Sequence, residues 1–376
     1  MFGHKHMLSR EGGVEIVVKE LATRMSARGH YVVCYDRKNK HVSGEKIQRV
    51  NEYKGVRIIN VWTLKLKGLA AVTSSWSSAI HAIRSHADIV HIHAEGPAAV
   101  TGMIKLLGKS KDGNPMRVIV TIHGLDWARS KWGGFASKYI KYGEKQAVKN
   151  ADEIIVLSRS VQEYFQREYG RNTHFIPNGV NAPALVPANE IKRLWGLEKD
   201  GYVLFLGRIV PEKGLRYLVE AWKDVKTDKK LVIAGGSSDT QSFSLELQKM
   251  ADDDSIVFTG FQQGRILEEL YSNSYIYCLP SDLEGMPLSL LEAMSYGNCC
   301  LVSDIPECTE VIGDRAAVFK KSNVEDLRLV LQQLIDNPER VMAYKNTASD
   351  YIISKYNWDE VAEKTLKLYK GQVLND

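Results

Sequence analysis

Residues 275–292 read YIYCLPSDLEGMPLSLLE and join a short apolar run to a loop and the start of a helix. The run YIYCL (275–279) is typical of a strand buried on both faces. Pro287 suits a first helical position, and Gly285 allows close approach to the loop backbone. The stretch therefore predicts a strand whose carboxyl end leads through a loop into a helix, which is the unit of parallel α/β sheets.

The same pattern recurs along the chain in two series. In the first half we expect strands at 31–35, 56–62, 88–92, 117–122 and 153–157, and helices at 13–28, 72–86, 96–107 and 134–149. The second series has strands at 202–206, 231–234, 256–258, 275–279, 299–302 and 316–319, separated by helices. Apolar strands joined by helical crossovers indicate two doubly wound α/β domains with parallel sheets.

A linker is expected near PNGVNAPALVP (177–187), where three of the ten prolines cluster. We therefore divide the chain into a first domain at 1–180, a second at 181–356 and a C-terminal helix at 357–376. Open α/β sheets bind ligands outside the carboxyl ends of their strands, so a cleft between the domains is the expected site.

Composition excludes a disordered chain, because 44% of the 376 residues are hydrophobic and 25% are charged. Residues 1–180 carry 28 Lys and Arg against 15 Asp and Glu, whereas the remainder carries 22 against 30. The basic half indicates an anionic partner. Five cysteines without a CxxC pair favour a reducing cytosol. We expect neither a signal peptide nor a spanning segment, since no apolar run approaches about 20 residues.

Glu284 and Glu292 flank the predicted helix start. The amides of that start suit a phosphate, which carboxylates would repel, so the two glutamates suit hydroxyls of a sugar and a ribose on either side of a diphosphate. An ordinary helix start with solvated acids is the alternative.

GRIVPEKG (207–214) follows the strand at 202–206 and places two cations, Arg208 and Lys213, in one loop of an otherwise acidic half. An Arg fork and a Lys point charge suit a diphosphate. Surface basic residues of no particular role are the alternative.

Further candidates lie in the first half. Gly12 and Gly13 precede a helix and would let a phosphate approach, although a simple turn is as plausible. His123 follows the strand at 117–122 and should face the cleft, unless it is a loop or core histidine. His91 and His93 end the neighbouring strand on one face, where we favour packing over metal binding. The acidic run Asp252–Asp254 precedes a strand and is interpreted as a solvated turn.

Lys138, Lys141, Lys145 and Lys149 recur at helical spacing and form one basic face. Aromatic residues lie just upstream, and a second aromatic and basic group occurs nearby; these residues are Trp127, Trp132, Phe135, Trp62, Lys65 and Lys67. The arrangement favours docking on anionic lipid, with a merely solvated face as the alternative. The sequence contains no recognised nucleic-acid module, so nucleic acid is not expected as a partner.

Taken together, the Glu284–Glu292 spacing, GRIVPEKG, FIPNGV (175–180) and the early Gly-Gly loop resemble the retaining glycosyltransferases of family 4, which have the GT-B fold. SREGGVEIVVKELATRMSARGH (9–30) is similar to bacterial enzymes of capsule and exopolysaccharide assembly.

The resemblance implies that Arg208 and Lys213 bind the donor diphosphate. It implies that Glu284 contacts the sugar, that backbone amides in the segment Gly285, Met286, Pro287 and Leu288 help to hold the sugar and phosphate, and that Glu292 binds the ribose. Gly12 and Gly13 match the loop that approaches the diphosphate from the other domain, His123 matches a histidine near the reacting centre, and Asn178 lies in the linker motif.

The function implied is transfer of a sugar from a nucleotide-diphosphate sugar, with UDP favoured over GDP or dTDP, to a glycan or lipid-linked acceptor. No metal or other cofactor is expected, because protein cations and helix amides meet the leaving-group charge. The enzyme is expected in the cytoplasm, peripheral on the inner face of the plasma membrane. A GT-B sugar-nucleotide epimerase and a non-catalytic module for anionic ligands are the alternatives.

One departure concerns the first strand, which family members place before the Gly-rich loop. Here only Met1 and Phe2 precede Gly3, so we expect this strand to be truncated.

Overall fold

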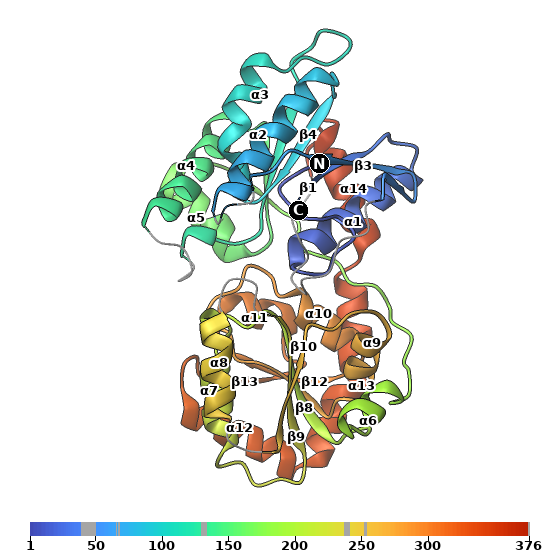
Figure 1. Cartoon of the computed structure of the whole chain (residues 1–376), viewed down its shortest axis with the longest axis vertical. Helices are drawn as coiled ribbons and strands as arrows, with labels where there is room; N and C mark the ends of the chain where they lie inside the picture. Colours follow the sequence, from blue (N-terminus) through green and yellow to red (C-terminus); the bar gives the residue numbers. More distant parts are fainter. Residues whose placement is uncertain are drawn as a thin grey trace. The chain divides into compact units, whose positions relative to one another are not determined.

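The computed structural model describes residues 1–38, 50–64, 66, 68–128, 134–236, 241–251 and 254–374. Lys65, Lys67, Trp132, Asp252 and Asp253, singled out above, lie outside these residues. The chain divides into two compact units (Figure 1): unit 1 comprises Met1–Asn178 and Trp358–Asp376, and unit 2 comprises Gly179–Asn357.

Unit 2 is built on a six-stranded parallel sheet. Its strands are β8 (Tyr202–Leu206), β9 (Lys230–Ala234), β10 (Ile256–Gly260), β11 (Ile276–Leu279), β12 (Cys299–Ser303) and β13 (Ala317–Phe319). Their order in space is β10-β9-β8-β11-β12-β13, so the direction of winding reverses between β8 and β11. Ligands of doubly wound sheets bind at such a switch point, outside the carboxyl ends of the strands.

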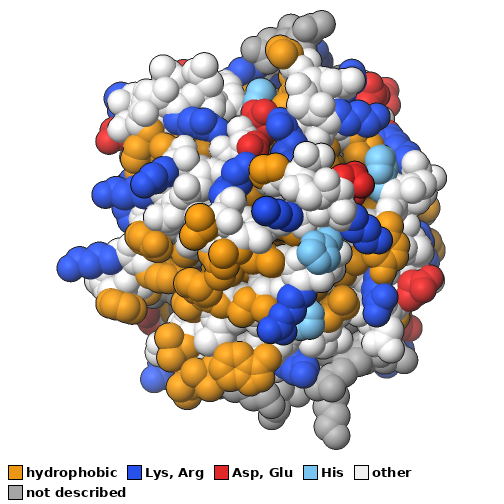
Figure 2. Space-filling view, turned by 90° about the horizontal axis from the view of Figure 1, so that it is seen from above, with side chains coloured by type: hydrophobic (Ala, Val, Ile, Leu, Met, Phe, Trp, Pro, Cys, Tyr) orange, Lys and Arg blue, Asp and Glu red, His pale blue; other side chains and the backbone are white. Residues whose placement is uncertain are grey.

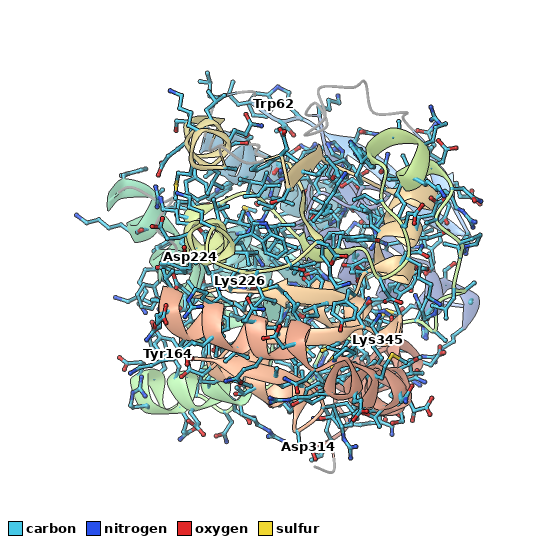
Figure 3. All side chains as sticks on the ribbon, turned by 90° about the horizontal axis from the view of Figure 1, so that it is seen from below. Trp62, Tyr164, Asp224, Lys226, Asp314 and Lys345 are labelled. Carbon is cyan, nitrogen blue, oxygen red and sulfur yellow. The ribbon has the colours of Figure 1, made fainter. Side chains whose placement is uncertain are left out.

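Helices cover both faces of this sheet, as Figure 1 shows, and the strands are accordingly buried. The helical segments are α6 (Glu190–Trp195), η3 (Pro211–Lys213), α7 (Leu215–Trp222), α8 (Gln241–Met250), α9 (Gly264–Asn273), α10 (Leu288–Ser295), α11 (Pro306–Ile312), α12 (Val324–Asp336) and α13 (Pro338–Lys355). The side chain of Asn323 caps α12 by accepting the amide of Asp326 at 3.0 Å. Lys345 of α13 (Figure 3) donates to the carbonyl of Ser274 at 2.9 Å, which ties this long helix to the sheet.

Unit 1 has the same order of strands around its switch point, with the bridge formed by Phe2 in the place of a first strand. Its strands are β1 (Val33–Arg37), β2 (Glu52–Tyr53), β3 (Val56–Val61), β4 (Ile89–His93), β5 (Arg117–Ile122), β6 (Glu153–Val156) and β7 (His174–Phe175). They form the sheets β1-β3-β2 and β4-β5-β6-β7, in which all pairs are parallel except β2 with β3.

The first residues of the chain join these two sheets. Tyr35 donates its amide to the carbonyl of Met1 at 3.0 Å on one side, and His93 donates to the carbonyl of Phe2 at 2.8 Å on the other. The two residues before Gly3 therefore supply the pairing expected of a first strand, with Phe2 buried in the core.

The helical segments of unit 1 are α1 (Gly13–Ala27), α2 (Leu69–Arg84), η1 (Pro97–Val100), α3 (Thr101–Leu107), η2 (Asp126–Ala128), α4 (Gly134–Asn150), α5 (Arg159–Tyr169) and α14 (Trp358–Tyr369). The last of them, α14, belongs to unit 1 and contacts α1. Arg117 donates to the carbonyl of Leu368 at 3.0 Å, which fastens the end of α14 to β5. Two doubly wound units and a C-terminal helix that returns to the first are therefore confirmed.

All five cysteines are buried free thiols. Burial raises the pKa of Cys34 to about 12, so this thiol is unreactive near neutral pH. Within the described residues, no helix is both long and apolar enough to cross a membrane.

Candidate active site

The loops that follow β8 and β11 meet at the switch point of unit 2. Gly214 ends the first loop with φ +67°, a conformation that L-residues rarely adopt. A Cβ at this position would lie 1.8 Å from the carbonyl oxygen of Pro280 in the second loop. The amide of Asp282 also donates to the carbonyl of Glu212 at 2.9 Å. Gly214, the last residue of GRIVPEKG, is thus required for the contact between the two loops.

Lys213 and Glu284 form a nearly buried ion pair across these loops. The Lys213 Nζ lies 2.5 Å from the Glu284 Oε1, and the two side chains are 12% and 7% exposed. The hydroxyl of Ser281 donates to the same carboxylate oxygen at 2.6 Å. The fold therefore brings together two residues that are 71 positions apart in the sequence.

The glycine-containing segment of the second loop is buried around the start of α10. Gly285, Met286, Pro287 and Leu288 all have little exposure. The helix begins at Leu288, and Pro287 is its N-cap with extended backbone, so the expectation of Pro287 at the first helical position is wrong by one residue. Arg208, directly after β8, is partly buried in the same unit.

Glu292 lies a turn inside α10 and is partly exposed. The Tyr271 hydroxyl donates to its Oε2 at 3.1 Å, and the Tyr271 ring stacks on Tyr296 with centroids 5.2 Å apart. Its carboxylate is therefore positioned by an aromatic pair.

The sequence reasoning missed polar groups at this switch point. The Tyr217 hydroxyl donates to Asp282 Oδ2 at 3.0 Å, and the Ser322 hydroxyl donates to Asp282 Oδ1 at 2.7 Å. Ser281 and Asp282 follow β11 almost directly, and polar residues in that position are the signal that could have identified them.

Gly12 and Gly13 lie at the start of α1, with Gly12 as its N-cap. The neighbouring Glu15 is buried, and its Oε1 accepts the amide of Lys5 at 2.8 Å. Lys5 also pairs with Glu11 at 2.9 Å. An anion at the two glycines would therefore have both a carboxylate and an ammonium group nearby, and their phosphate role stays a prediction.

Three histidines meet at the carboxyl ends of β4 and β5. The His91 and His93 rings stack with centroids 4.2 Å apart, and the His93 Nδ1 lies 3.1 Å from the His123 Nε2. His91 also contacts the Tyr369 hydroxyl at 2.6 Å and the Thr121 hydroxyl at 2.7 Å. Within the described residues, no group of three or more His, Cys, Asp or Glu side chains is arranged to hold a metal ion.

A buried carboxyl pair lies beside these histidines. Glu95 follows β4, and its Oε2 accepts the amide of Asp126 at 2.8 Å. Burial raises the pKa of Glu95 well above 4.5, and its protonated form can donate to Glu144. Burial also acts to raise the pKa of Glu144, but hydrogen bonds from Glu95 and Lys141 outweigh this and leave it lowered.

The same carboxylate contacts two residues of the predicted lipid-facing surface. Trp127 donates its indole N–H to Glu144 at 2.9 Å, and Lys141 pairs with Glu144 at 2.7 Å while lying 4.3 Å from the Trp127 ring centroid. Both side chains therefore contact the buried acid of α4 and are only partly exposed. Lys138, Lys145 and Lys149 are exposed, as is Phe135.

Two family models match the chain in succession. The model described as Glycosyltransferase Family 4 matches residues 11–182, and that described as Glycosyl transferases group 1 matches residues 188–351. The two matches correspond closely to units 1 and 2.

Individual proteins match over most of the chain. The alpha-maltose-1-phosphate synthase of Mycolicibacterium smegmatis is 24% identical over 81% of this chain and 85% of its own. An Escherichia coli UDP-Gal:alpha-D-GlcNAc-diphosphoundecaprenol alpha-1,3-galactosyltransferase is 26% identical over 77% of this chain and 76% of its own. The Anabaena protein HepE, crystallised with UDP-glucose, aligns with a TM-score of 0.79 at 13% identity over 98% of both chains.

Proposed function

We propose that this chain, a glycosyltransferase of the family 4 type with the GT-B fold, transfers a sugar with retention from a UDP-sugar to a glycan or lipid-linked acceptor in capsule or exopolysaccharide synthesis. The observation that carries the proposal is the Lys213–Glu284 pair at the switch point of unit 2. It holds a cation and a carboxylate side by side, which is the combination that a diphosphate attached to a sugar requires.

In this proposal Arg208 and Lys213 neutralise the diphosphate, helped by amides at the start of α10. When phosphate oxygens approach Lys213, they share its charge with Glu284, and this carboxylate then accepts hydrogen bonds from sugar hydroxyls. Glu292, one turn inside α10, accepts hydrogen bonds from the ribose.

The reaction proposed is attack from the leaving-group side. The acceptor oxygen forms a bond to the anomeric carbon as the bond from that carbon to the diphosphate oxygen breaks. A phosphate oxygen takes the acceptor proton, so no protein base is assigned. His123 positions or polarises a reacting group, and Gly12 and Gly13 approach the diphosphate from unit 1.

The nucleotide and the acceptor rest on the relatives. The Escherichia coli relative is named for a UDP-sugar donor and a diphosphoundecaprenol acceptor, and HepE was crystallised with UDP-glucose. These names favour a uridine nucleotide and a lipid diphosphate acceptor for this chain.

A donor screen tests the core of the proposal. Purified protein is incubated with UDP-, GDP- and dTDP-sugars, with and without a polyprenyl-diphosphate sugar, and the released nucleoside diphosphate and the products are measured. We expect a UDP-sugar to be consumed faster with the acceptor and its sugar to appear on the lipid with retained configuration. Acceptor-independent conversion to an isomeric nucleotide sugar would indicate an epimerase, and no turnover of any donor would contradict the proposal.

We also propose that unit 1 attaches peripherally to anionic membranes. Leu69, Trp76 and Ile80 are 41–44% exposed and recur at spacings of seven and four along α2, so they share one face. On α4, Phe135 and Tyr142 are 83% and 51% exposed. Figure 2 looks onto unit 1 from above and shows hydrophobic side chains gathered with Lys and Arg among them.

Charge supports an anionic lipid as the partner. The sequence of α2 contains no Asp or Glu, and the one acid of α4, Glu144, is buried. The exposed lysines Lys138, Lys145 and Lys149 would each contribute roughly 1 kcal/mol near an anionic surface, less at high salt.

Vesicle co-sedimentation tests this attachment with phosphatidylcholine vesicles, with and without phosphatidylglycerol, at low and high salt. We expect salt-sensitive binding to the anionic vesicles only. It should weaken when Lys138, Lys145 and Lys149 are changed to Gln and remain when Lys223, Lys226 and Lys321 of unit 2 are changed instead. Equal binding of the two triple variants would contradict the assignment to α4.

A further inference from the structure

His93 is a buried histidine to which the proposed reaction assigns no role. It ends β4, and register pairing places it opposite Thr121 of β5, two residues before His123. Its Nδ1 contacts the His123 Nε2 at 3.1 Å, within hydrogen-bond distance. His93 is fully buried, whereas His123 is partly exposed. Of the two, only His123 can therefore contact a ligand, and His93 contacts His123 from its buried side.

Burial favours the neutral forms of His93 and His91. Burial lowers the pKa of His93 well below 6.5, and repulsion by His91, His123 and His4 lowers it further. Burial has the same effect on His91, which stacks on His93. A neutral imidazole carries one N–H, so its two nitrogens have opposite roles.

Because burial favours the neutral form of His93, its contact with His123 contains either a hydrogen on the His93 Nδ1 or one on the His123 Nε2. If His123 donated it from Nε2, His93 would carry its own hydrogen on its Nε2, which is buried with no hydrogen-bond partner. If His93 donates from Nδ1, its own Nε2 carries no hydrogen and is an acceptor without a partner. Orphaned buried N–H groups are the rarer case in proteins, so the second arrangement is favoured.

We propose that His93 is a positioning residue that donates from Nδ1 to the His123 Nε2 and thereby places the one proton of His123 on Nδ1. His123 then presents a hydrogen-bond donor at its other nitrogen and does not act as a base. This rests on the proposed function only in assuming that His123 contacts substrate. It deepens that function, because it explains how a histidine near the reacting centre polarises a group without removing a proton.

Nitrogen spectroscopy of the wild-type protein tests the tautomer directly. Long-range proton–nitrogen correlation spectra of protein with ¹⁵N-labelled histidine are recorded at pH 7.5, and the His123 signals are identified by their absence in His123→Gln. We expect a protonated-type Nδ1 and a bare-type Nε2 for His123. The opposite pattern, or one exchange-averaged pair of shifts, would overturn the proposal.

Two variants test whether His93 is the cause. His93→Asn keeps an amide donor near the Nδ1 position, whereas His93→Leu removes it. We expect the Asn variant to retain the His123 tautomer and most of kcat, and the Leu variant to lose the tautomer and at least about tenfold in kcat, with little change in donor KM. His91→Gln is the matched control, because it alters the stack and leaves the His93–His123 contact in place.

Thermal unfolding of each variant separates a folding defect from loss of positioning. If His93→Leu does not fold, the wild-type spectrum and His93→Asn still decide the question. Failure of the donor screen with the expected tautomer present would count against the proposed function alone. The opposite tautomer in an active enzyme would count against this inference alone.

Discussion

In the loops after β8 and β11 of unit 2, Lys213 and Glu284 form an ion pair 2.5 Å long. At the carboxyl end of β4 in unit 1, burial instead favours the uncharged forms of His93 and Glu95. The strand order around the two switch points is the same, so the fold does not dictate this difference. Under the proposed function, the charged edge of unit 2 would meet the charged diphosphate, and the uncharged edge of unit 1 would meet groups that carry no net charge.

The largest loss of activity is expected when a cation of the unit 2 site is removed. Lys213→Ala and Arg208→Ala should each lose at least about 2 kcal/mol of transition-state stabilisation, or roughly 30-fold in kcat/KM, because a charge partner of the leaving group is lost. The measurement is kcat/KM at subsaturating donor. Lys226→Ala, an exposed lysine of the same unit (Figure 3), is the control. Wild-type turnover in either variant would exclude its phosphate role.

The two glutamates of unit 2 should separate by role. Glu292→Ala should weaken binding of free UDP about tenfold, or about 1.4 kcal/mol, through loss of the ribose contact. Glu284→Ala should lower kcat yet leave UDP affinity unchanged or tighter, because Lys213 loses a competing carboxylate. Calorimetric titration with UDP checks both. Equal weakening by the two substitutions would contradict the assignment.

The same Glu→Gln substitution should have different effects on kcat/KM in the two units. Glu95→Gln should leave kcat/KM near the wild-type value, because an amide can replace a protonated carboxyl, whereas Glu284→Gln should reduce it by removing the charge beside Lys213. The raised pKa of Glu95 also predicts a pH effect on stability. Its contribution is fully present below about pH 4.5 and is lost as pH rises through the folded-state pKa.

The melting temperature of Glu95→Gln relative to wild type should therefore rise as pH increases from 4.5 to 8. Thermal unfolding across this range, for both proteins, provides the test. A difference that stayed constant with pH would mean that Glu95 is ionised in the folded protein.

The smallest effect is expected from metal removal. Donor turnover should be unchanged by EDTA, since Arg208, Lys213 and helix amides are proposed to neutralise the diphosphate. Turnover is measured before and after chelation, followed by addition of Mg²⁺ or Mn²⁺. Abolition by EDTA and recovery with either metal would disprove neutralisation by protein groups.

Local sequence pattern was sufficient for most strands and helices, although α5 was not among the helices expected. Apolar runs such as YVLFL at 202–206 predict buried parallel strands, because a strand covered on both faces needs no polar alternation. A C-terminal helix was expected from residue 357, and α14 begins at Trp358. The two-residue strands β2 and β7 were not predicted, since so short a run carries no periodicity.

Only the tertiary structure decided which of these loops meet. Lys213 and Glu284 are 71 residues apart, and they pair because β8 and β11 are neighbours in the sheet. Helical spacing placed Lys141 on a basic face, yet it turns toward Glu144, whose burial no local pattern reveals. The contact of His93 with His123 likewise follows from the pairing of β4 with β5. Spacing along the chain determines the face of an element, whereas a side chain's charge state and partners depend on what packs against that face.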